Sequence, residues 1–236
     1  MRTLLARILL SSTALAAAGA LGWLLFVSPY ARFRTLKVEG NHRATESALR
    51  HLANLPVGAP LASLDLDRAA ENVAHHPWVA SVEVGRSLPE TVILRVEERV
   101  PVALLSMDGL FLVDATGEAF ARAHPGDLDL PVLTGLDDAV LAADPPLARR
   151  LVRDALAIQA AGTSRGAIAA EDISEVHFDA KAGYSLALRN GGEILLGFAG
   201  VDALDRLPRM AASGLDLARP HRVDLAPRLL AVATPL

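Results

Sequence analysis

The sequence predicts an α+β protein with a single transmembrane helix, and three successive patterns carry that prediction. An uncharged apolar segment occupies residues 8–27. Residues 33–103 then show a β-α-α-β-β order, and residues 104–236 show a mainly antiparallel β pattern with one long helix. The part after the apolar segment, about 200 residues, is long enough for one or two domains with cores of their own.

The apolar segment is long enough to cross a membrane. A helix over residues 8–27 rises about 1.5 Å per residue and so spans roughly 30 Å, the thickness of a bilayer's hydrocarbon core. A cleaved signal peptide is the alternative, because two arginines precede the run and residues 16–18, all alanine, resemble a cleavage site. We expect an uncleaved anchor, since the most apolar part, residues 21–27, follows those alanines. Residues 1–7 would form a short tail.

Composition excludes several classes of function. The chain has 23 Lys+Arg and 27 Asp+Glu residues and a formal net charge of -4, so it offers no strongly basic face for nucleic acid. It contains no cysteine, which excludes a disulfide framework, a cysteine-based zinc site and a thiol nucleophile.

The first soluble region begins with a strand and two capped helices. Residues 35–39 alternate between apolar and polar side chains, as a half-buried strand does, and Gly40 breaks the pattern. Thr45 is a suitable N-cap for a short helix, and Asp65 for a second helix that Pro77 ends.

A hairpin completes this region. Residues 79–85 and 91–97 alternate in the same way as the first strand, and residues 87–90 form a turn between them.

The second soluble region is richer in strands. Residues 110–114 and 118–120 form a hairpin. A long helix is predicted over residues 145–161, with Asp144 as its cap and Gly162 as its stop. The later elements are strands over residues 173–178, 184–188 and 193–196, a short helix over residues 201–210 interrupted by Pro208, and strand-like runs over residues 222–225 and 229–232.

Five short motifs follow one another in a fixed order. They are Val38-Glu39-Gly40-Asn41, Pro77-Trp78-Val79, Leu88-Pro89-Glu90-Thr91, Val113-Asp114 with Gly117, and Pro131-Val132-Leu133-Thr134-Gly135. In this order they resemble the FtsQ/DivIB family of bacterial cell-division proteins. The resemblance implies a polypeptide-transport-associated (POTRA) domain over residues 33–103 and an FtsQ-type β domain over residues 104–236. The chain departs from the family pattern after Val-Asp-Leu, where Ala226-Pro227 replaces the usual arginine.

The resemblance also implies a function. Family members are single-pass inner-membrane scaffolds with a cytoplasmic N-terminus and periplasmic domains, and they recruit division proteins such as FtsB, FtsL and FtsK to the septum. Neither a cofactor nor a small-molecule substrate is implied, and the chain is expected not to be an enzyme. Arginines lie on both sides of the apolar segment, so the charges alone leave its orientation open.

The end of the chain is the candidate partner-binding site. Leu229, Leu230, Ala231 and Val232 form a short terminal strand whose unpaired backbone groups a partner could complete. The simpler interpretation is an ordinary sheet edge, blunted by Pro227 and Pro235.

The remaining candidates for a metal site or for acid/base catalysis have simpler explanations. His75 and His76 are adjacent, so they point to different sides of a helix, and a zinc site needs three or four converging ligands. The carboxylates of Asp65, Asp67 and Glu71 are explained by helix capping and a solvated face.

Two other functional classes remain as alternatives. One is a membrane-anchored exported hydrolase or metal-dependent enzyme. The other is an outer-membrane transporter with a POTRA domain, which the lack of repeated alternating segments disfavours.

Overall fold

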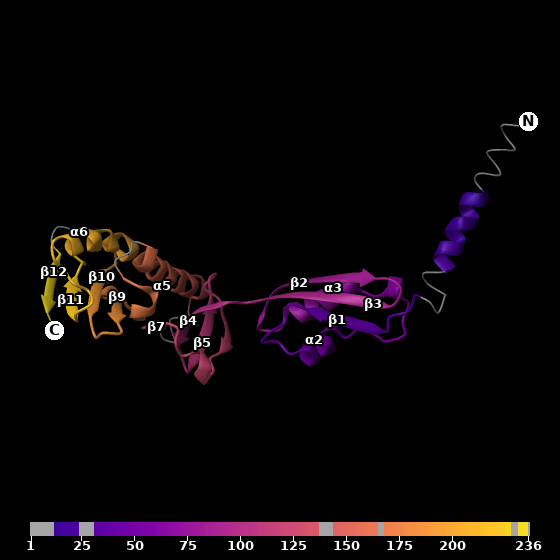
Figure 1. The fold of residues 1–236 in the computed structure, drawn as a ribbon, viewed down its shortest axis with the longest axis horizontal. Coiled ribbons are helices and arrows are strands. Elements are labelled where there is room, and N and C mark those ends of the chain that lie inside the picture. Colours follow the sequence, from indigo (N-terminus) through magenta and orange to yellow (C-terminus); the bar gives the residue numbers. More distant parts are fainter. Residues whose placement is uncertain (1–11, 24–30, 137–143, 165–167, 228–230, 236) are drawn as a thin grey trace, which may run out of the picture. The chain divides into compact units, whose positions relative to one another are not determined.

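The computed structural model describes residues 12–23, 31–136, 144–164, 168–227 and 231–235 (Figure 1). Its contacts divide the chain into two compact units, Met1–Arg99 and Val100–Leu236. The boundary predicted from the sequence, after Ala103, lies within the strand Pro101–Ser106 of the second unit. Within the predicted anchor, residues 12–23 are helical, and the others lie outside the described part of the chain. No described helix combines the length and the apolar character that a membrane crossing requires.

The first unit has the predicted β-α-α-β-β order, with a three-stranded sheet. The strands lie in the order β1-β3-β2, in which β1 is parallel and β2 antiparallel to the central β3. The elements are β1 (Thr35–Glu39), α2 (Glu46–Ala53), the 3-10 helix η1 (Leu61–Ser63), α3 (Leu66–Ala74), β2 (Val79–Ser87) and β3 (Thr91–Glu98).

Both predicted helix caps are confirmed. The Thr45 hydroxyl accepts the Ala48 N–H at 3.3 Å, and the Asp65 carboxylate accepts the Arg68 N–H at 3.0 Å. The helices bury their apolar faces against the sheet in a core whose fully buried members include Leu49 from α2, Val73 from α3, and Val92 and Leu94 from β3.

A single carboxylate ties the loop after β1 to the end of β3. Glu98 accepts main-chain hydrogen bonds from His42, Arg43 and Ala44, at distances of 2.8 to 3.0 Å. Partial burial raises the pKa of the Glu98 carboxyl, but these hydrogen bonds outweigh it and hold the pKa below the ordinary value. The loop therefore depends on the ionised form of Glu98.

The second unit is built on a nine-stranded sheet in the order β12-β11-β10-β9-β8-β7-β4-β5-β6. Most neighbours are antiparallel, as predicted, and the parallel pairs are β4–β7, β7–β8 and β10–β11. The strands are β4 (Pro101–Ser106), β5 (Leu110–Asp114), β6 (Ala119–Arg122), β7 (Val132–Thr134), β8 (Ile173–Asp179), β9 (Gly183–Leu188), β10 (Glu193–Gly197), β11 (His221–Asp224) and β12 (Val232–Pro235).

Helices cover this sheet and form its core. They are α5 (Pro145–Ser164), the 3-10 helix η4 (Gly200–Arg206) and α6 (Leu207–Ala212). Ile158 from α5 and Leu204 from η4 share one buried cluster with Leu186, Ile194 and Val223 of the sheet. This cluster fixes β9, β10 and β11 firmly in the fold.

Several predictions for this unit need correction. The strands β4 and β7 were not predicted, because β4 is a continuous apolar run without alternation and β7 is only three residues long. Gly162 does not end α5, which continues to Ser164. The apolar spacing of residues 145–161 also predicts Leu147 on the buried face of this helix, but Leu147 is 43% exposed. Pro208 does not interrupt a helix but stands in the first turn of α6, where its missing N–H costs no helical bond.

Replacing Glu98 with glutamine should destabilise the first unit. The Glu98→Gln amide keeps one acceptor oxygen and places an NH₂ group among N–H donors, so we expect a loss of about 1–2 kcal/mol in the free energy of unfolding. Urea denaturation at neutral pH measures this loss, with Glu97→Gln as the neighbouring control, since Glu97 contacts the Ser81 hydroxyl on the surface.

The same loss should depend on pH. A carboxyl whose pKa is lowered in the folded state stabilises above its unfolded value, 4.5, and this contribution disappears as the pH falls through the folded pKa. The gap between the wild-type protein and Glu98→Gln should therefore close well below pH 4.5. A gap that stayed constant down to acid pH would contradict this role for the ionised carboxylate.

Candidate partner-binding edge

The strand β12 ends the nine-stranded sheet and has β11 as its neighbour (Figure 1). The two strands are antiparallel, with Asp224 opposite Val232 and Arg222 opposite Thr234. All four residues of β12 are exposed. The strand is therefore attached through main-chain pairing, with little apolar burial of its own.

The hydrogen bonds of β11 determine which residues of β12 face outward. The Leu225 N–H bonds the Leu195 carbonyl of β10 at 2.8 Å, so Leu225 and, two residues earlier, Val223 turn their main-chain groups toward β10. Successive residues of a strand turn these groups to opposite sides, so Arg222 and Asp224 turn theirs toward β12.

Their partners in β12 follow from the register. Thr234 and Val232 lie opposite Arg222 and Asp224, so their main-chain groups bond β11. Ala233, opposite Val223, directs its N–H and C=O away from the sheet. Within β12, Ala233 supplies the outward donor, and Pro235 can supply only a carbonyl because proline has no N–H.

A hollow of about 490 Å³ adjoins this edge. Its walls include Met210 of α6, Leu215 just beyond that helix, and Ala231, Ala233 and Pro235. Alternate side chains of β12 thus face the hollow, and a strand added beside β12 would direct every second side chain over it.

The predicted site is only partly described. Leu229 and Leu230 lie outside the described residues. Ala231 immediately precedes β12, and Val232 is its first residue, 48% exposed. The strand occupies a later stretch than the predicted residues 229–232. Sequence reasoning missed Ala233 and Thr234, since Val-Ala-Thr-Pro has no alternation to reveal them.

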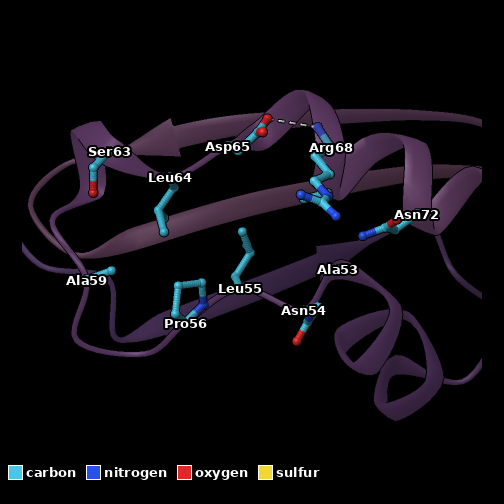
Figure 2. Close-up of a pocket in the computed structure, with 11 residues that line it drawn as sticks. Ala53, Asn54, Leu55, Pro56, Ala59, Ser63, Leu64, Asp65, Arg68 and Asn72 are labelled. Carbon is cyan, nitrogen blue, oxygen red and sulfur yellow. Dashed lines mark hydrogen bonds between the residues drawn. The ribbon is translucent and has the colours of Figure 1, made fainter.

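A second hollow, of about 430 Å³, lies in the first unit between the loop after α2 and the start of α3. Figure 2 shows Arg68 and Asn72 reaching over it from α3, with Leu55 and Leu64 pointing into it. Asp65 lines it as well, but its carboxylate caps α3. The predicted structural role of Asp65 is therefore confirmed.

The histidines next to α3 make local contacts. The His75 Nδ1 lies 2.7 Å from the Glu71 carbonyl, and the His76 Nδ1 lies 3.3 Å from the Trp78 N–H. Among the residues that the structure describes, no group of histidine, aspartate and glutamate side chains converges as a metal site would require.

One polar cluster was not foreseen from the sequence. On β7 and β8, the Thr134 hydroxyl donates to the Glu175 carboxylate and lies 2.7 Å from the His177 Nδ1. A nucleophilic relay needs the histidine between the hydroxyl and the carboxylate, with one ring nitrogen for each. Here the hydroxyl lies in the middle and the carboxylate faces the same Nδ1, at 3.7 Å. The cluster therefore joins two strands but does not activate a nucleophile.

Comparisons with known proteins give consistent matches. Residues 31–99 match the model of the FtsQ-type POTRA domain, and residues 103–226 match that of the cell division protein FtsQ/DivIB C-terminal domain. The chain is 38% identical over 208 residues to the cell division protein FtsQ of Anaeromyxobacter sp. (strain K), covering 87% of this chain and 71% of that protein.

Further relatives carry the same name. The FtsQ protein of Myxococcus fulvus is 38% identical over 190 residues, which are 80% of this chain and 66% of the relative. That of Syntrophotalea carbinolica is 32% identical over 172 residues, 72% of this chain and 61% of the relative. The chain thus spans about two thirds of the length of these relatives. The two domain matches cover the two units in the predicted order, and the chain belongs to the FtsQ/DivIB family of cell-division proteins.

Proposed function

We propose that this chain is a scaffold of the bacterial division machinery that recruits and links other division proteins at the septum. Membership of the FtsQ/DivIB family supports this role and confirms the expectation that the chain is not an enzyme. No observation favours the alternative of an exported hydrolase. The work of the protein is therefore binding, and its surfaces are its functional sites.

The open edge of β12 is the observation that carries the binding mechanism. A partner segment that pairs with Ala233 gains two main-chain hydrogen bonds there, each of about 0.5–1.5 kcal/mol net. Its side chains on one face would lie over the hollow beside Met210 and Leu215. The proposed contact region is thus Leu229, Leu230, Ala231 and Val232, extended to Ala233.

The partners we propose are division proteins similar to FtsB, FtsL and FtsK. An FtsB-like chain with an extended segment is the candidate for the β12 edge, because main-chain pairing requires an extended partner. We further propose that residues 33–103 act as a POTRA domain and residues 104–236 as a β domain, each with its own binding surfaces.

The proposed location is the inner membrane. Residues 8–27 would cross it once, with residues 1–7 in the cytoplasm and residues 33–236 in the periplasm. The absence of charge over residues 8–27 supports this arrangement, since a single central charge opposes insertion by roughly 3 kcal/mol.

A fluorescent fusion of the full chain should concentrate at the septum of dividing cells. Depletion of the protein should give filaments that an intact copy rescues, because a scaffold is needed wherever its partners assemble. Microscopy of the fusion and of depleted cells measures both effects. Uniform membrane fluorescence together with normal division after depletion would exclude the scaffold role.

Protease added to spheroplasts should digest the bulk of the protein, and the intact form should fractionate with membranes. Intact cells, whose outer membrane excludes the protease, provide the control. A soluble periplasmic species that begins near Ala20 would instead identify residues 8–27 as a cleaved signal peptide.

Proline substitutions should distinguish the N–H group of β12 that faces outward from those that bond β11. Ala233→Pro removes the outward donor and leaves the bonds to β11, so we expect an unchanged melting temperature and about a two- to tenfold loss of affinity for an FtsB-like partner. Thr234→Pro removes an inward donor and should lower stability. Titration calorimetry and thermal melting measure the two effects.

Ala233→Ser keeps the N–H and is the matched control, with wild-type affinity expected. Deletion of residues 228–236 should leave the first unit folded and abolish partner binding. If folded Ala233→Pro binds the partner as tightly as the wild-type protein does, the interface lies away from this edge.

A further inference from the structure

Three chain segments lie side by side at one end of the first unit. The Phe33 N–H bonds the Ala59 carbonyl at 2.9 Å, and the Gly58 N–H bonds the Phe33 carbonyl at 2.7 Å. On the other side of the same segment, the Arg34 N–H bonds the Glu90 carbonyl at 2.9 Å. Residues 31–35, 55–61 and 86–91 therefore form one continuous surface, which we call the arginine tip.

The arginine tip presents apolar side chains to solvent. Val57 is 76% exposed, in the loop after α2, and Leu88 is 68% exposed, in the hairpin between β2 and β3. Each lies within its loop beside an exposed proline, Val57 beside Pro56 and Leu88 beside Pro89. Two large apolar side chains exposed on one surface could enter a membrane interface together.

The charge of the tip is positive. Its charged residues are Arg32, Arg34 and Arg86 against Glu90, a net of +2 (three positive, one negative). The Arg34–Glu90 pair is loose and exposed, at 3.6 Å. Arg32 donates to the main-chain carbonyl of Gly58, and Arg86 to those of Leu61 and Leu64. Among the described residues, no carboxylate pairs with either guanidinium. The tip therefore suits an anionic surface.

Chain length places this surface close to the proposed anchor. Four peptide steps separate Val27, the last apolar residue of the anchor, from Ala31 of the tip. Fully extended, they reach at most roughly 14 Å. The headgroup layer begins where the hydrocarbon core ends, so the tip cannot move far from it.

We propose that the arginine tip docks on the lipid headgroups, with Val57 and Leu88 entering the interface and the arginines meeting anionic phosphates. This proposal rests on the anchor of the proposed function. The docked tip would fix the direction in which β1, β2 and β3 leave the membrane.

Site-specific fluorescence on the full chain in vesicles tests the docking. The chain has no cysteine, so Val57→Cys, Leu88→Cys, His42→Cys and Ala18→Cys each create a single attachment site for an environment-sensitive dye. The vesicles contain phosphatidylglycerol and phosphatidylethanolamine, with or without brominated acyl chains that quench nearby dyes. His42 is the matched control, because it lies at the Glu98 end of β3, roughly 25 Å from the tip.

Dyes at residues 57 and 88 should shift to the blue and be quenched, and the dye at residue 42 should show neither change. Leu88→Asp should abolish the blue shift and the quenching of the dye at residue 57. Leu128→Asp, at an exposed leucine of the second unit, should leave both unchanged. Arg34→Gln should lower the docked-to-free ratio roughly fivefold on anionic vesicles, and Arg95→Gln, on the middle of β3, should not.

The dye at residue 18 separates the two proposals. If it is quenched while the dyes at residues 57 and 88 remain in water, the anchor stands and the docked tip is wrong. If the dyes at residues 57 and 88 are quenched but the dye at residue 18 is not, the tip binds lipid and the anchor is wrong. If none is quenched, both proposals fail.

Discussion

The alternation of main-chain hydrogen bonds along β11 is the constraint on which the proposed binding edge depends. Val223 is fully buried, and the Leu225 N–H is bonded to β10, so the core fixes which side of β11 faces outward. That parity passes through the register to β12 and leaves Ala233 as the outward donor. A one-residue slip of β12 would exchange its inward and outward groups, and the edge would present different residues to a partner.

The two units are stabilised in different ways, and this difference matches the roles proposed for them. In the first unit, Glu98 satisfies three successive N–H groups of the loop after β1, so a polar clamp supplements the apolar core. In the second unit, the core holds β8 to β11, but β12 has no buried side chain. Burial thus decreases toward β12, and elements with few buried apolar contacts are the ones that open locally most easily.

The sequence predicted those elements whose local signals agree with their tertiary environment. Thr45 and Asp65 cap their helices, and the alternating strands β1, β2, β3 and β9 appeared where they were expected. β4 was missed because its continuous apolar run lacks alternation, and β7 because it is only three residues long. The stop predicted at Gly162 was wrong because α5 continues to Ser164, and Gly162 lies inside the helix against Ile173. The parity of β12 could not come from the sequence, since it is inherited from the bonds between β10 and β11.

A short, exposed terminal strand has an intrinsic disadvantage that a partner can remove. Val232, Ala233 and Thr234 gain little from burial, so their order rests on a few main-chain bonds that must offset roughly 1–2 kcal/mol of backbone entropy per residue. The proposed partner strand would supply bonds on the other side and cover the hollow beside Met210. Binding and ordering of β12 would then be thermodynamically coupled, so the edge would be most stable when it is occupied. Pro235 limits this pairing at the far end, because it offers no N–H, and so restricts how far a chance partner could extend along the edge.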